Sequence, residues 1–203
     1  PGWNYDDFLE DFQPEMTAFP VEGNTVKVYK KENGALEVDP PFFSNNFKVD
    51  PFFKSEDYTI KRDFYTNQFS YPATISKTGY LQEIPFKTSP EVTVALLKEK
   101  TSKDIKLLNI ELPKDFKIIY SEKTDDVLRK MMLVSDNFIA EQILLVCAST
   151  LSNDLDTHDI ITYSKTYFMN ELANEMNWVD GSGLSRYNLF KLNTSIAILK
   201  KIS

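Results

Sequence analysis

The chain has 203 residues, of which 42% are hydrophobic and 13% aromatic, so one large domain or two small ones could each bury a core. The net charge of -7 argues against a nucleic-acid partner, because such partners are bound by clustered Lys and Arg side chains. No apolar stretch approaches the roughly 20 residues that a transmembrane helix needs. We therefore expect neither a nucleic-acid-binding surface nor a transmembrane segment.

The single cysteine and the single histidine limit the chemistry that the chain can perform. Cys147 lies in an apolar run, Ile143 to Ala148, which predicts a small buried side chain and excludes a disulfide framework or a Cys-based metal site. His158 lies in a polar stretch that is typical of a linker and a helix start. We expect no metal, no cofactor and no Ser-His-Asp triad.

The first part of the sequence predicts mainly β structure. Thr25 to Lys30 alternates apolar and polar residues with period two, as a half-buried strand does. Asn33-Gly34 then predicts a turn and Ala35 to Val38 a partner strand. Further short strands are expected at Tyr58 to Phe64 and at Tyr80 to Ile84.

The pattern changes at Ser89, where a favoured N-cap residue followed by proline predicts a helix that runs to about Lys100. A short strand is expected at Phe116 to Tyr120. The shift in composition near Leu112-Pro113 is the predicted domain boundary.

The remainder is predicted to be helical. One helix begins at Thr124 and ends at Ser135, and the next is apolar most of the way round, which predicts burial. Further helices are expected over His158 to Met176 and Thr194 to Ile202.

Ser135-Asp136-Asn137 places a hydroxyl, a carboxylate and an amide between two predicted helices. Such residues are typical helix N-caps, so a capping role is one interpretation. A second Ser-x-Asn, Ser44-Asn45-Asn46, lies in a polar loop, so the triplet alone is weak evidence for a site.

The surroundings of the triplet carry a more specific signal. Leu128 to Leu144 reads LRKMMLVSDNFIAEQIL, and Asp180 to Asn188 follows as DGSGLSRYN. Together with Pro1 to Asp7, which is similar to a Gly-Trp-x-(aromatic)-Asp-Asp stretch, these segments resemble the peptidase S13 family. Its members are the class C low-molecular-mass penicillin-binding proteins, which are D-alanyl-D-alanine carboxypeptidases and endopeptidases.

The resemblance implies a serine acyl-enzyme mechanism on peptidoglycan stem peptides, with β-lactam antibiotics as further ligands. It implies that Ser135 relays a proton to the leaving amine and that Asn137 hydrogen-bonds the substrate. Trp3, Asp6 and Arg186 would line the pocket for the stem-peptide side chain. Their chemistry suits a zwitterionic end, since Asp6 can pair with an ammonium and Arg186 with a carboxylate.

Two motifs of that mechanism are missing from their expected places. No Ser-x-x-Lys occurs in the sequence, so the nucleophile and its base are absent. Lys77-Thr78-Gly79 lies upstream of Ser135 rather than downstream, and we interpret it as a turn. We expect an inactive internal part of an active enzyme; the alternative is a non-catalytic cell-wall-binding or partner-binding module.

The resemblance also implies the architecture, a mixed α and β fold. Residues 1–115 would be an inserted, mainly β region, and residues 116–203 an incomplete helical part of the penicillin-binding acyl-transferase domain, which has a β-lactamase/transpeptidase-like fold. An incomplete domain exposes apolar surface, which permits self-association into a homo-oligomer. Family membership implies export to the periplasm or cell envelope.

Overall fold

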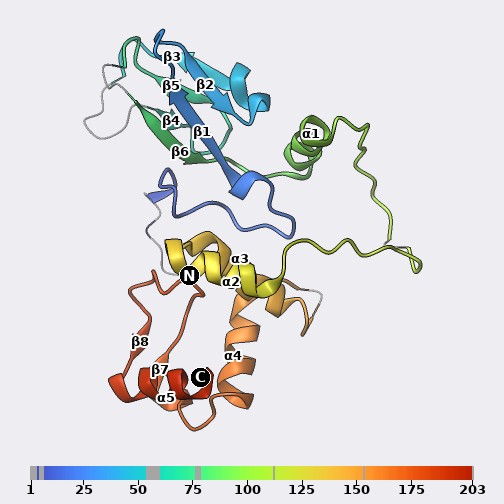
Figure 1. Cartoon of the computed structure of the whole chain (residues 1–203), viewed down its shortest axis with the longest axis vertical. Coiled ribbons are helices and arrows are strands. Elements are labelled where there is room, and N and C mark those ends of the chain that lie inside the picture. The colour runs from blue at the N-terminus through green and yellow to red at the C-terminus, as the bar shows by residue number, and fades with distance from the viewer. Residues whose placement is uncertain are drawn as a thin grey trace. The chain divides into compact units, whose positions relative to one another are not determined.

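The computed structural model describes residue 4 and residues 7–53, 60–75, 79–111, 113–152 and 154–202. These residues form a mixed α and β fold of small sheets and helices. The contacts between residues divide the chain into two compact units, one of Asp6–Ser121 and one of Glu122–Ser203 with Pro1–Tyr5. Figure 1 shows the sheets of the first unit in blue to green and the helices of the second in yellow to red. The predicted domain ranges, 1–115 and 116–203, stay a prediction.

The first unit contains a three-stranded antiparallel sheet in the order β2-β1-β6. The central strand β1 (Thr25–Lys30) pairs with β2 (Leu36–Asp39) and with β6 (Leu81–Pro85). Val26 and Val28 on β1 are fully buried, as the period-two alternation predicts. These pairings confirm the hairpin predicted from Thr25 to Val38. They also confirm the strand predicted at Tyr80 to Ile84, which lies one residue later, at Leu81–Pro85.

A second small sheet has the order β3-β5-β4. β5 (Phe69–Tyr71) pairs in parallel with β3 (Phe47–Val49) and antiparallel with β4 (Lys61–Arg62). The strand expected over Tyr58 to Phe64 is thus shorter than predicted, and residues 58 and 59 lie outside the described residues. The buried Arg62 side chain donates from Nε to the Pro85 carbonyl at 2.8 Å, which links this sheet to the end of β6.

Aromatic side chains fill the core of this unit. Phe43, Phe69 and Phe86 are almost fully buried, and the ring centroid of Phe43 lies 6.1 Å from that of Phe69 and 5.0 Å from that of Phe86. These rings are the largest of the side chains that are almost fully buried in this core.

The segment before β1 is held to the first unit by Glu15. Its carboxylate accepts hydrogen bonds from Lys87 and from the Thr88 backbone N–H and hydroxyl, the last two at 2.9 and 2.8 Å. Burial by itself would raise the pKa of the Glu15 carboxyl, but the hydrogen bonds from Lys87 and Thr88 hold that pKa below its usual value. The carboxylate therefore stays charged and keeps the segment attached.

The helix α1 (Pro90–Thr101) begins as the sequence predicts, with Pro90 at its first position. The Ser89 hydroxyl oxygen accepts a hydrogen bond from the Val92 N–H at 3.2 Å.

Replacing Ser89 by Ala leaves that N–H without its cap, so we expect a loss of about 1 kcal/mol in the free energy of unfolding. Urea denaturation of the purified chain measures it, with Ser121→Ala at an exposed loop position as control; equal stability of the two variants would contradict the capping role.

The second unit is mainly helical. Its helices are α2 (Thr124–Val134), α3 (Asn137–Ala148), α4 (Thr157–Tyr167) and α5 (Leu192–Ile202), with a two-stranded pairing of β7 (Met176–Asn177) and β8 (Leu189–Phe190). The core is small and lies where α3 meets α4: Leu144, Ala148, Ile160 and Ile161, with Trp178 packed against it. α3 and α4 therefore share the core of this unit.

The strand predicted at Phe116 to Tyr120 is wrong. Residues 113–121 form no strand, and the Ile119 and Tyr120 side chains are 92% and 85% exposed. A strand needs a neighbour for its backbone hydrogen bonds, and none of the described strands pairs with this segment. This β-forming sequence therefore belongs to none of the described sheets.

Two predictions about the helices also need correction. The helix expected over His158 to Met176 ends at Tyr167, and the chain then turns, with the Asn170 side chain accepting a hydrogen bond from the next N–H at 2.9 Å. α3 buries one face only, since Val146 is 65% exposed and Cys147 is exposed rather than buried. The apolar run does not distinguish the face that meets α4 from the face that meets solvent.

Candidate functional site

Ser135 forms the junction between α2 and α3. Its backbone lies in the left-handed region, at φ 56° and ψ 49°, and its N–H closes α2 on the Met131 carbonyl. The Asp136 N–H bonds to the same carbonyl at 2.9 Å. Ser102 ends α1 in the same conformation, so the backbone geometry alone does not mark a site. At Ser135, unlike Ser102, a second helix begins within two residues.

Asp136 is the N-cap of α3. The capping role that the sequence allows for Ser135-Asp136-Asn137 therefore belongs to the middle residue. Its carboxylate accepts a hydrogen bond from the Ile139 N–H at 2.9 Å. Ser135 is exposed and Asn137 is half-buried, and within the described residues neither side chain makes a hydrogen bond. The hydroxyl and the amide are thus free to meet a ligand, while the carboxylate is used by the helix.

The loop between β7 and β8 is organised by Asp180. This buried carboxylate accepts hydrogen bonds from the N–H groups of Gly183 and Ser185, at 2.8 and 2.7 Å, and from the Asn188 side chain at 2.7 Å. The Trp178 indole N–H donates to the Asp180 carbonyl at 2.6 Å. A buried charge needs several such donors, and Gly183, Ser185 and Asn188 of its own loop supply three of them.

The same loop rests directly on α3. A side-chain carbon added at Gly181 would lie 2.7 Å from the Ala140 carbonyl oxygen, so only glycine fits there. The Glu141 carboxylate, which is 4% exposed, accepts a hydrogen bond from the Ser182 N–H at 2.8 Å. The positive φ that a tight turn demands is found at Gly183, at 79°. The sequence indicates a glycine turn, but nothing in it signals the contacts of Gly181 and Glu141 with the helix.

Arg186 lies in the same loop, one residue after Ser185, and is exposed. α3 thus carries Asn137 at its start and supports, one turn later, the loop that presents Arg186. No hydrogen bond or ion pair joins Arg186 to Ser135 or Asn137 within the described residues. Trp3 and Asp6 lie outside the described residues, as do Lys77 and Thr78 of the Lys-Thr-Gly.

Comparisons with solved structures identify the fold. The chain is similar to the crystal structure of penicillin binding protein 4 from Haemophilus influenzae, with a TM-score of 0.69 and 17% identity over 99% of this chain and 49% of that one. This chain has the fold of one half of that protein. A crystal structure of the same protein complexed with a novel β-lactam also matches, with a TM-score of 0.58 and 19% identity over 94% of this chain and 49% of that one.

The likeness at these identities establishes the mixed α and β fold and not the activity. The sequence matches no protein-family model and no curated protein significantly, so membership of the peptidase S13 family stays a prediction. The chain spans about half the length of the penicillin binding protein 4 chains that it matches.

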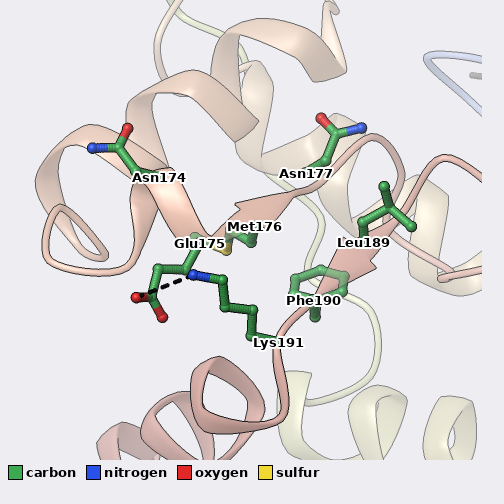
Figure 2. A pocket seen from close by; sticks show the side chains of 7 residues that line it. All are labelled: Asn174, Glu175, Met176, Asn177, Leu189, Phe190 and Lys191. Carbon is green, nitrogen blue, oxygen red and sulfur yellow. Dashed lines mark ion pairs between the residues drawn. The ribbon is translucent and has the colours of Figure 1, made fainter.

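An open cavity of about 430 Å³ lies elsewhere in the second unit, at the β7 and β8 pairing. Figure 2 shows its lining, in which the Lys191 ammonium pairs with the Glu175 carboxylate at 3.5 Å beside the apolar Met176 and Phe190. Of the predicted site residues that the structure describes, which are Ser135, Asn137 and Arg186, none lines it.

Neither a metal site nor a membrane span is found in the part of the chain that the structure describes. There, no three His, Cys, Asp or Glu side chains are grouped so that they could hold a metal ion. No helix in those residues has the length and apolar character to cross a membrane.

Proposed function

We propose that this chain is part of a serine-type D-alanyl-D-alanine carboxypeptidase/endopeptidase that cleaves peptidoglycan stem peptides through an acyl-enzyme. The observation that carries the proposal is the fold of penicillin binding protein 4 over 99% of the chain, with the Ser-Asp-Asn sequence at the junction of α2 and α3. Membership of the peptidase S13 family and a location in the periplasm or cell envelope belong to the same proposal.

In this proposal Ser135 is the proton relay. A serine outside these 203 residues attacks the D-Ala-D-Ala carbonyl, and the terminal D-Ala leaves as an amine that must gain a proton. The free, exposed Ser135 hydroxyl is suited to pass it on, and the Asn137 amide can both donate to and accept from the substrate peptide. Asp136 takes no part, because it caps α3.

Substrate selection is assigned to Arg186 with Trp3 and Asp6. The guanidinium can bind a carboxylate of the stem-peptide side chain bidentately, Asp6 can pair with its ammonium, and Trp3 can cover its methylenes. The rigid loop around Asp180 supports the role of Arg186, since a side chain on a fixed backbone loses less freedom on binding. β-Lactams are proposed as ligands because the nucleophile would attack their amide in the same way.

The second candidate is a non-catalytic module that binds cell wall or a protein partner. It is favoured by the absence of Ser-x-x-Lys from the sequence. Exposed apolar side chains on α2, where Met132 and Leu133 are 74% and 78% exposed, suit a protein partner or a homo-oligomer. The catalytic proposal is preferred because it accounts for the Ser135 and Asn137 pair.

Incubation with a labelled penicillin, followed by mass measurement of the intact protein and of its peptides, tests the proposal. We expect the complete natural protein to gain one covalent penicillin on a serine outside this sequence. The 203-residue chain alone is expected to gain none, because it lacks the nucleophile. A stable adduct on this chain would overturn the assignment of the nucleophile, and an unlabelled complete protein would support the binding module.

A further inference from the structure

One buried side chain, Glu141, joins the two parts of the proposed site. These parts are the start of α3 and the loop that carries Arg186. Glu141 lies one helical turn after Asn137 on α3, and its carboxylate is 4% exposed. The hydrogen bond that it accepts comes from the Ser182 N–H at 2.8 Å, in the loop that leads to Arg186. Burying a carboxylate is unfavourable unless a donor compensates for the water it loses, so this contact is not an incidental surface pairing.

The loop cannot adjust easily if that contact is lost. Asp180 holds Gly183 and Ser185 from inside the loop, and Gly181 approaches α3 so closely that an added side-chain carbon would clash with the Ala140 carbonyl. The internal hydrogen bonds of Asp180 therefore hold Gly183 and Ser185 together independently of the contact with α3. The hydrogen bond from the Ser182 N–H to the Glu141 side chain ties this loop to α3.

We propose that Glu141 is a positioning residue that sets the place of Arg186 relative to Ser135 and Asn137, and thereby the preference for the stem-peptide side chain. This inference rests on the proposed function. Glu141 contacts no substrate in this scheme; it acts through the Ser182 N–H. The charge is not what positions the loop, since the amide oxygen of Gln accepts the same hydrogen bond.

The experiment uses the complete natural protein and two stem peptides, one with a zwitterionic side chain and one with that side chain truncated to a methyl group. The readout is the ratio of kcat/KM for the two peptides, which a smaller folded fraction of enzyme leaves unchanged. We expect Glu141→Ala and Arg186→Ala each to lower the ratio about 10-fold, since a misplacement of about 1 Å can cost up to 100-fold. Glu141→Gln should retain the ratio.

Glu171→Ala, at an exposed glutamate of the same unit, serves as the matched control and should leave the ratio unchanged. Hydrogen exchange of the Ser182 amide should be faster in Glu141→Ala than in Glu141→Gln. An unchanged ratio in Glu141→Ala, together with a lowered ratio in Arg186→Ala, would overturn the inference alone. A complete wild-type protein that turns over neither peptide would overturn the proposed function and the inference with it.

Discussion

Replacing Ser135 by Ala in the complete protein is expected to slow acyl transfer about 100-fold, because a positioned group that transfers a proton contributes on that order. The hydroxyl is exposed and free of hydrogen bonds within the described residues, so its removal leaves no buried partner unsatisfied. Stopped-flow acylation by penicillin and the release of D-Ala from a stem peptide would both measure the loss.

The left-handed backbone at Ser135 requires a second variant. Glycine adopts φ 56° without strain, so Ser135→Gly removes the hydroxyl while relaxing the junction of α2 and α3. The rate of acyl transfer should fall by the same factor in both variants, although only the alanine variant carries the backbone strain. Ser44→Ala changes the exposed serine of the other Ser-x-Asn and should keep full activity. Full carboxypeptidase turnover by Ser135→Gly would refute the relay.

Replacing Asp180 by Ala is expected to lower the free energy of unfolding of the 203-residue chain by about 3 kcal/mol. The change removes the acceptor of two backbone N–H groups and of one Asn188 hydrogen bond, at a position where Asp180 and Ser185 are buried from water. Chemical denaturation monitored by tryptophan fluorescence, to which Trp178 at the Asp180 carbonyl contributes, would measure it.

Asp180→Asn separates the charge from the hydrogen bonds. The Asn oxygen can still accept from Gly183 and Asn188, but its NH₂ group faces the Ser185 N–H, so a loss smaller than that of the alanine variant is expected. Asp154→Ala removes an exposed carboxylate of the same unit and should change stability by no more than about 0.5 kcal/mol. If Asp180→Ala were no less stable than Asp154→Ala, the proposed organisation of the loop would be wrong.

Local signals in the sequence predict the elements whose causes are local. The hairpin of β1 and β2 follows from alternation and a glycine turn, and the start of α1 follows from Ser89 and Pro90. The junction at Ser135 to Asn137 is predicted for the same reason, since capping involves residues within one turn of each other. The mixed α and β fold, predicted from the resemblance, agrees with the solved structures.

Predictions that depend on distant partners were less successful. Phe116 to Tyr120 has the composition of a strand, but a strand exists only where another strand supplies its hydrogen bonds. Cys147 lies in an apolar run, but which face of α3 is buried depends on where α4 packs. The roles of Trp3, Asp6 and Arg186 stay predictions.

By itself, the sequence determined the hairpin, the start of α1, the junction between α2 and α3, and the residues that carry the resemblance to penicillin-binding carboxypeptidases. Only the tertiary structure decided that Asp136 serves the helix while the side chains of Ser135 and Asn137 are left free. It alone decided that Gly181 and Glu141 hold the Arg186 loop on α3. The physical reason is that these contacts join residues about 40 positions apart, such as Ser182 and Glu141, and no local pattern encodes which distant groups will meet.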